Sequence, residues 1–252
     1  MRVGVLLALA CATACAVPTL AAPSTLSVLD RSIDVDRARG DRAGGPVLIF
    51  LHGYGSAPET FLGLAQRTDL PQGTHLILPR GPNTLASGAS WWPLPSDVHR
   101  IVRERLPGMD DARARVSALL DRVAREMPGR PIVLGGFSQG AMVSLDVALH
   151  DAAPLAGLVL MSGTMIDERE TRARLGSRRG LRVYVSHGRE DPVIPYVDDA
   201  RLAEAMRDSG LDVSFAPFEG GHVVTPRVSM EVAAFVRRCA ARSDHGTLAP
   251  PP

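Results

Sequence analysis

The sequence predicts an α/β fold in which helices flank both faces of a mostly parallel central sheet. Short apolar runs alternate with longer amphipathic ones along the chain, and this alternation is typical of parallel strands joined by helical crossovers. The apolar runs are also continuous, as expected of strands that are buried on both faces. The length of 252 residues and the hydrophobic content of 45% are sufficient for one sizeable core.

Continuous apolar runs predict the strands. The clearest is 46–51, where Pro-Val-Leu-Ile-Phe-Leu ends at His52-Gly53. A short run of this kind, ended by a turn residue, is typical of a central strand of a parallel sheet. The predicted strands are 46–51, 74–78, 131–134, 155–161, 181–186 and 212–218.

Helices are predicted between these runs. In 110–127 the apolar residues recur at steps of three and four and therefore share one helix face, which consists of Val116, Leu119, Leu120, Val123 and Met127. Further helices are predicted at 139–149, 196–208 and 226–240. The Arg-rich stretch 169–179 is interpreted as a solvated helix face.

The N-terminal segment 1–22 has the pattern of a signal peptide. Arg2 precedes an apolar run from Val3 to Ala16, and small residues follow up to Ala22. The run is shorter than the roughly 18 residues that a membrane-spanning helix needs, and no later stretch reaches that length, so no transmembrane span is predicted. We therefore expect a secreted or periplasmic protein.

The cysteines are consistent with this expectation. Cys11 and Cys15 lie in the N-terminal segment and Cys239 lies alone near the other end, so no disulfide framework is expected after cleavage. Residues 12–15 also resemble a bacterial lipoprotein cleavage box. A less favoured alternative is therefore a protein anchored through a lipid on Cys15.

The remaining chain is predicted to form one domain. Residues 23–242 contain no internal repeat or linker and are expected to form a single catalytic domain. Residues 243–252 are Pro-rich and lack apolar periodicity, which predicts a disordered tail. Nothing in the sequence indicates the oligomeric state.

The composition excludes several function classes. The 28 basic residues balance 27 acidic ones, so no nucleic-acid partner is expected. All basic residues are Arg, which excludes catalysis by a lysine Schiff base or a P-loop lysine. No dinucleotide motif or Cys-zinc pattern occurs after residue 22, and His52 lacks a second ligand at matching spacing, so neither a cofactor nor a metal is expected. His52 is instead interpreted as positioning its own loop.

A serine nucleophile is predicted at Ser138. Gly136-Phe137-Ser138-Gln139-Gly140 matches G-x-S-x-G and lies between the predicted strand 131–134 and the predicted helix 139–149. This is the order of a nucleophile elbow, in which a sharp turn leaves no room for neighbouring Cβ atoms. The competing interpretation is an ordinary glycine-rich turn with an exposed serine.

A base and an acid are needed to activate this serine. In α/β hydrolases an acid and then a histidine follow the nucleophile in the chain, which favours His222 in the glycine-rich loop after the last strand. His150 ends a helix, His187 precedes the best acid and His245 lies in the tail. Asp191 is the preferred acid, because it follows the strand 181–186. Glu190, Asp198, Asp199 and Asp167 remain open as competitors, each of which could be a helix cap or a surface charge.

Motifs in four places together resemble the phospholipase/carboxylesterase family of α/β hydrolases, which includes the acyl-protein thioesterases. They are Leu51-His-Gly-Tyr-Gly55, Gly136-Phe-Ser-Gln-Gly140, His187-Gly-Arg-Glu-Asp-Pro-Val-Ile-Pro195 and Gly220-Gly-His222. The resemblance covers roughly residues 45–240. It implies an α/β-hydrolase fold and a triad of Ser138, Asp191 and His222, with an oxyanion hole formed by the backbone N–H groups of Tyr54 and Gln139.

The resemblance also implies a substrate pocket near Trp91, Trp92 and Tyr54. Family members often carry Trp-Phe-Asp where this chain has Ser90-Trp-Trp-Pro93, so the two tryptophans are equally consistent with a role in covering the core. This departure leaves the specificity open. So does the predicted signal peptide, because a secreted enzyme is a poor candidate for depalmitoylating cytosolic proteins.

The sequence therefore predicts a serine hydrolase that cleaves small-molecule acyl esters through an acyl-enzyme, with thioesters and lysophospholipids as further substrate classes. One alternative is a secreted polyester or feruloyl esterase-like hydrolase, which has the same chemistry with another pocket. A less favoured one is a hydrolase-fold binding module without catalysis.

Overall fold

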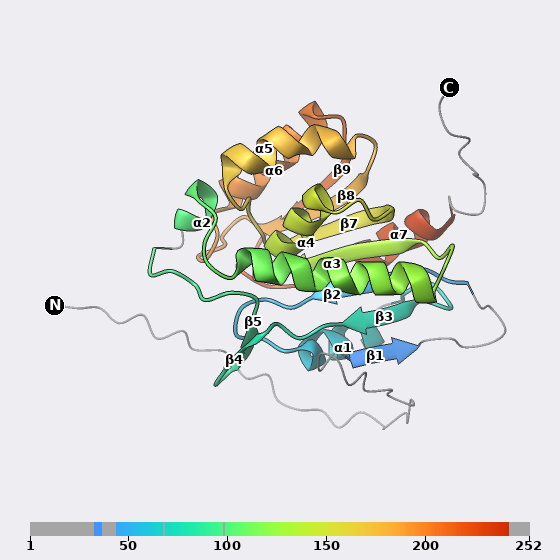
Figure 1. The fold of residues 1–252 in the computed structure, drawn as a ribbon. Coiled ribbons are helices and arrows are strands. Elements are labelled where there is room, and N and C mark those ends of the chain that lie inside the picture. Colours follow the sequence, from blue (N-terminus) through green and yellow to red (C-terminus); the bar gives the residue numbers. More distant parts are fainter. Residues whose placement is uncertain (1–32, 37–43, 68, 98, 242–252) are drawn as a thin grey trace.

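The computed structural model describes residues 33–36, 44–67, 69–97 and 99–241 (Figure 1). The predicted signal peptide 1–22, the possible lipid site at Cys15 and the predicted tail 243–252 lie outside the described residues. Their structure and the ends of the predicted domain remain predictions.

A seven-stranded sheet forms the centre of the fold, with the strand order β1-β3-β2-β6-β7-β8-β9. Six of these strands, β3, β2, β6, β7, β8 and β9, are parallel to one another. The edge strand β1 pairs antiparallel with β3. The sheet strands are β1 (Ile33–Asp36), β2 (Val47–Leu51), β3 (His75–Leu78), β6 (Ile132–Phe137), β7 (Leu155–Met161), β8 (Arg182–Gly188) and β9 (Asp212–Phe218).

The predicted strands are all present. Every residue of β2 and β3 is buried, as their continuous apolar sequences predicted. β6 runs three residues further than predicted, through Gly135 and Gly136 to Phe137. The glycines permit this extension, because a Cβ at Gly135 would lie 2.7 Å from the Val159 Cβ on the neighbouring strand.

Helices cover both faces of the sheet, which confirms the predicted α/β fold class. Figure 1 shows α3 and α4 in front of the sheet and α1 and α7 behind it. The front core contains Val116 and Leu120 of α3, and the rear core contains Val232 and Val236 of α7. The helices are α1 (Pro58–Arg67), α2 (Arg100–Arg103), α3 (Met109–Glu126), α4 (Gln139–His150), α5 (Glu168–Leu175), α6 (Tyr196–Asp208) and α7 (Pro226–Ala241).

Several elements were not predicted. They are β1, α1, α2, and a hairpin of β4 (Asn83–Leu85) and β5 (Gly88–Ser90) that projects from the sheet in Figure 1. These elements are short or lie at the edge of the fold, so their sequences lack a long periodic pattern. The Arg-rich stretch 169–179 is only partly α-helical, because α5 ends at Leu175 and a 3-10 turn follows at Gly176–Arg178.

Among the described residues, no helix is both long and apolar enough to cross a membrane.

Candidate active site

Ser138 occupies a sharp turn between β6 and α4. Its backbone has φ 54° and ψ −120°, a conformation that is strained for a residue with a Cβ. The Ser138 N–H donates to the Met161 carbonyl of β7 at 2.8 Å, which fixes the turn against the neighbouring strand. The serine is partly exposed at the carboxyl end of the sheet, where ligands bind in open α/β sheets.

The glycines of the motif are required by close packing. A Cβ at Gly136 would lie 2.4 Å from the Gly140 carbonyl carbon, and a Cβ at Gly140 would lie 2.2 Å from the Leu51 carbonyl oxygen. A side chain at either position would therefore force the backbone apart. These contacts are the structural reason for the G-x-S-x-G pattern.

His222 and Asp191 are joined by a hydrogen bond of 2.7 Å between Nδ1 and Oδ2. The His222 ring also packs against the ring of Phe137, the residue before Ser138, with a centroid distance of 4.7 Å. There is no hydrogen bond between Ser138 and His222 among the described residues. Such bonds are often long in free enzymes and shorten only when substrate binds.

The Asp191 carboxylate is completely buried and has several donors. Oδ1 accepts hydrogen bonds from the N–H groups of Val193 at 2.8 Å and Ile194 at 2.9 Å. Oδ2 accepts from His222, and His187 Nε2 lies 3.3 Å from it. Burial alone would raise the pKa of Asp191, but the contacts with His187 and His222 and the Ile194 N–H hold it well below its usual range. Asp191 is therefore ionised whenever His222 acts as a base.

The competing acids have other partners. Asp167 caps α5 by accepting from the Glu170 N–H at 3.1 Å. Asp198 lies in the first turn of α6, and Glu190 is exposed. Asp199 is buried and pairs with His187 instead. Of the acids that the sequence left open, Asp191 is the one bonded to His222.

The loop after β2 lies against the nucleophile. A Cβ built on Gly53 would be 3.3 Å from the Ser138 Cβ, so the backbone immediately before Tyr54 packs against the serine. Gln139 is the first residue of α4, where backbone N–H groups are free to bind an anion. In the described part of the chain, no group accepts a hydrogen bond from the N–H of Tyr54 or Gln139.

His52 holds this loop in place. Its Nδ1 lies 2.8 Å from the Gly53 carbonyl and its Nε2 accepts from the Gly81 N–H at 2.9 Å. Burial lowers the pKa of His52, so the ring is neutral and carries its proton on Nδ1. The described residues contain no group of three or more His, Cys, Asp or Glu side chains arranged to hold a metal.

Trp91 and Trp92 are both buried in the front core. The Gln139 side chain bridges them, with Oε1 accepting from the Trp91 N–H and Nε2 donating to the Trp92 carbonyl, both at 2.9 Å. The Trp91 indole N–H donates to the His52 carbonyl at 2.8 Å. The tryptophans thus tie the hairpin to the loop beside Ser138, an arrangement that the sequence did not reveal. Their contact with substrate remains a prediction.

Three exposed apolar side chains lie close in the chain to the predicted site residues. Tyr54, Val193 and Val223 are exposed, and each lies at or within two residues of a predicted site residue. An apolar pocket of about 40 Å³ lies behind the sheet, between α1 and α7. Its lining includes Phe50, Phe61, Leu76, Val224 and Val232, and excludes Trp91 and Trp92.

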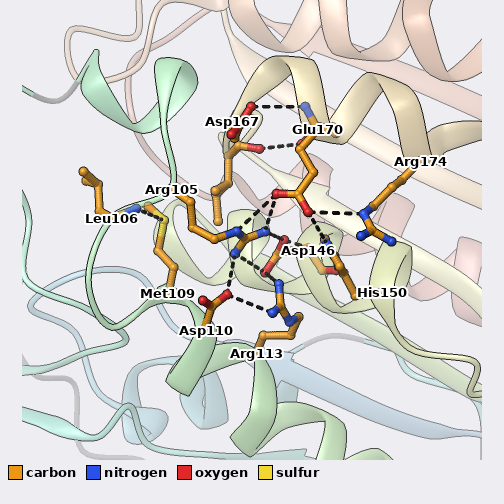
Figure 2. Close-up of polar contacts among 12 residues, drawn as sticks. Arg105, Leu106, Met109, Asp110, Arg113, Asp146, His150, Asp167, Glu170 and Arg174 are labelled. Atoms are coloured by element: carbon orange, nitrogen blue, oxygen red, sulfur yellow. Dashed lines mark hydrogen bonds and ion pairs between the residues drawn. The ribbon is translucent and has the colours of Figure 1, made fainter.

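A second cluster of charged side chains lies away from Ser138, where α4 meets α5 and the loop before α3 (Figure 2). Arg105 forms a two-pronged contact with Asp146, at 2.5 and 3.1 Å. His150 Nε2 lies 2.8 Å from Glu170 Oε1, and Glu170 also contacts Arg105 at 3.2 Å. We call Arg105, Arg113, Asp146, His150 and Glu170 the arginine network.

Comparison with known proteins identifies the family of this chain. Residues 38–240 match the family described as phospholipase/carboxylesterase. Acyl-protein thioesterase 1 of Mycosarcoma maydis is 26% identical over 215 residues, which cover 76% of this chain and 90% of that protein.

Solved structures are similar as well. The crystal structure of esterase PE8 has a TM-score of 0.70 at 26% identity and covers 82% of this chain and 97% of its own. Acyl-protein thioesterase 2 of Zea mays has a TM-score of 0.65 at 24% identity, with coverage of 84% and 99%, and supports the fold alone.

Proposed function

Because the chain belongs to the phospholipase/carboxylesterase family and is a carboxylic ester hydrolase, we propose that Ser138, His222 and Asp191 form its catalytic triad. The observation that carries the proposal is the 2.7 Å hydrogen bond from His222 Nδ1 to Asp191 Oδ2. It fixes the proton on Nδ1 and leaves Nε2 as the nitrogen that can accept a proton. The His222 ring packs beside the strained Ser138 turn.

In this mechanism the Ser138 hydroxyl attacks the acyl carbonyl carbon while His222 Nε2 takes the hydroxyl proton. The protonated His222 then gives that proton to the leaving oxygen, and the acyl group remains on Ser138. A water molecule attacks the acyl-enzyme by the same route, which releases the acid and restores the serine. Asp191 remains ionised throughout and stabilises the histidine cation.

The N–H groups of Tyr54 and Gln139 would bind the negative oxygen that forms during each attack. The proximity of the Tyr54 loop to Ser138 and the position of Gln139 at the start of the 12-residue helix α4 support this role. A donor of this kind contributes a factor of about 10² to 10³ to the rate.

The substrate class that we favour is an ester with an apolar acyl group. The exposed Tyr54, Val193 and Val223 beside the site support this choice. Thioesters and lysophospholipids contain a similar acyl carbonyl, and polyesters or feruloyl esters require a different pocket. Hydrolysis rates for p-nitrophenyl esters of increasing acyl length, measured beside an aromatic ester and a thioester, distinguish these classes.

The triad is tested by the variant Ser138→Ala. The wild-type protein should react with a fluorophosphonate probe at Ser138, and the variant should lose both this labelling and ester turnover while keeping its fold. Ser144→Ala is a matched control, because the Ser144 hydroxyl donates to the Gly140 carbonyl within α4. Continued labelling of the Ser138→Ala variant would refute the assignment.

We also infer export from the cell, on the basis of Arg2, the apolar run and the small residues up to Ala22. Mass spectrometry of the mature N-terminus tests this inference. A start near residue 23 supports a cleaved signal peptide, a lipid-modified Cys15 supports the anchored alternative, and an intact N-terminus in exported fractions contradicts both.

A further inference from the structure

A second histidine–aspartate pair lies directly behind Asp191. His187 is the penultimate residue of β8 and is completely buried. Its Nδ1 lies 2.7 Å from Asp199 Oδ2 on α6. Its Nε2 lies 2.9 Å from the Ile194 carbonyl and 3.3 Å from Asp191 Oδ2. Asp199, His187, Asp191 and His222 therefore form a continuous chain of contacts that ends beside Ser138.

The neighbours of His187 define its protonation. Both ring nitrogens face oxygen atoms, and a carbonyl oxygen can only accept a hydrogen bond. With Asp199 ionised, the form that satisfies both nitrogens is the imidazolium ion, with a proton on each. Burial raises the pKa of Asp199, and the contact with His187 opposes this shift. Burial by itself would lower the pKa of His187, but the contacts with Asp191 and Asp199 outweigh it and raise the pKa to about 10.

We propose that His187, held by Asp199, is a positively charged positioning residue for Asp191, so that the reaction depends on two linked histidine–aspartate pairs. This proposal rests on the proposed triad. Asp191 orients His222, and His187 orients Asp191 from the opposite side. The charge of His187 also offsets part of the Asp191 charge, so its removal should strengthen the attraction between Asp191 and a proton on His222.

Stability alone gives no reason for Asp199. It is completely buried, and its Oδ1 has no hydrogen-bond partner within the described ranges. Oδ2 accepts from the Gly163 N–H at 3.2 Å in addition to its contact with His187. A buried carboxylate with an unpaired oxygen is costly, and replacement of both members of a buried ion pair by apolar residues of similar size often causes no loss of stability. Positioning Asp191 gives Asp199 a function.

The other groups around the pair come from several elements. On α6, Asp198 adds negative charge near Asp199, and the Tyr196 ring meets the His187 ring edge-on at 6.2 Å. The Arg189 guanidinium, which follows β8, lies over the Tyr196 ring and pairs with Glu219. Any pH effect of His187 has to be separated from the effects of these charges.

The experiment compares Asp199→Asn and His187→Gln with the wild-type protein. In Asp199→Asn, His187 loses the carboxylate that stabilises its charge, and in His187→Gln the charge is removed while an N–H donor remains. We expect kcat to fall roughly 10-fold, as for residues that orient metal-binding histidines, with KM changed less than about threefold. The acid limb of kcat/KM should move to higher pH by roughly half a unit to one unit.

Asp198→Asn is the matched control. It makes the same chemical change at the next position of α6 without contacting His187, so its acid limb should stay within about 0.2 units of wild type. Rates are expressed per active site, counted by fluorophosphonate titration, so that loss of folded protein does not count as loss of rate.

The outcomes separate this inference from the triad. Absence of probe labelling in the wild-type protein would contradict the triad itself. Normal labelling with an unchanged acid limb in both variants would mean that His187 and Asp199 are only structural, and would overturn the inference. If neither variant folds, ¹⁵N spectra of histidine-labelled wild-type protein at pH 8 decide. A doubly protonated His187 supports the inference, and a neutral ring overturns it.

Discussion

Two clusters in this protein place a histidine next to carboxylates, and one of them lies beside Ser138. In the first, His187 and His222 alternate with Asp199 and Asp191 at the carboxyl end of the sheet. In the arginine network, His150 lies between the Asp146 carbonyl and the Glu170 carboxylate on the outer side of α4 (Figure 2). In both clusters a histidine nitrogen contacts a carboxylate oxygen, but the residues around the two clusters differ.

The difference lies in what else each cluster contacts. The arginine network contains Arg105 and Arg113, which balance its carboxylates, and it is partly solvated, with the Glu170 side chain 31% exposed. The first cluster is more deeply buried, and its last member packs against the residue before Ser138. A histidine–carboxylate contact thus becomes a candidate active site only where the sheet delivers a nucleophile to it.

The largest expected effect is that of Asp191→Asn. The substitution keeps the shape but removes the charge that orients His222, and we expect kcat to fall about 10⁴-fold, as in other serine triads. Hydrolysis of p-nitrophenyl acetate at pH 8 measures the effect, with circular dichroism to confirm the fold. A variant that retains a tenth of wild-type activity would contradict the catalytic role of the first cluster.

Asp146→Asn tests the arginine network, and we expect it to reduce stability rather than activity. The Asp146 side chain is 5% exposed, and its removal leaves Arg105 and Arg113 without their central carboxylate. Because the arginines are partly solvated, we expect a loss of about 2 kcal/mol in the free energy of unfolding, a fall of roughly 4–8 °C in Tm.

The activity per active site of this variant should remain within about twofold of wild type, because the network does not contact Ser138. The control is Asp110→Asn, whose carboxylate is 65% exposed and should change stability by less than about 1 kcal/mol. A strong loss of activity in a folded Asp146→Asn protein would contradict the view that only the first cluster acts in catalysis.

The smallest expected effect is the pH dependence of Glu170. The hydrogen bond with His150, with help from Arg105, lowers the pKa of Glu170 from 4.5 to about 2. Since the pKa is lower in the folded state, the stabilisation is present above pH 4.5 and is lost as the pH falls towards 2. Glu170→Gln should therefore cost at most about 1 kcal/mol at pH 7, given the exposure of the side chain.

Thermal unfolding of wild type and Glu170→Gln between pH 7 and pH 2 measures this dependence, with the two Tm curves converging below pH 4.5. Glu168→Gln removes an exposed pair with Arg172 on the same helix and should show a smaller difference at pH 7. A constant gap at every pH would mean that Glu170 acts through packing rather than through its charge.

The sequence predicted the parts of the site that depend on local order. Ser138 followed from the G-x-S-x-G pattern between a strand and a helix, because a sharp turn requires glycines on both sides. His222 followed from chain order. Asp191 could only be preferred among several acids, since each also fitted a cap or a surface charge. Which histidine each of these acids contacts was decided by the packing of β8 against α6.

Other features depended on contacts between distant segments. The Gln139 side chain bridges to Trp91 and Trp92, more than 40 residues earlier in the chain, and no local pattern encodes that bridge. Sequence order favoured His222 over His187 as the base, but gave no indication that Asp199 would be the partner of His187. The edge strand β1 and the β4–β5 hairpin were also missed, because short strands give a weak periodic signal.

The sequence by itself determined the fold class and the position of the strand-to-helix turn that carries Ser138, the proposed nucleophile. Apolar periodicity fixes which segments become buried strands and amphipathic helices, and glycine at 136 and 140 permits the strained turn between them. Only the tertiary structure decided which carboxylate meets which histidine. The reason is physical: a hydrogen bond of 2.7 Å depends on the register of β8, the loop after it and the start of α6 together, and none of these positions is set by its own residues alone.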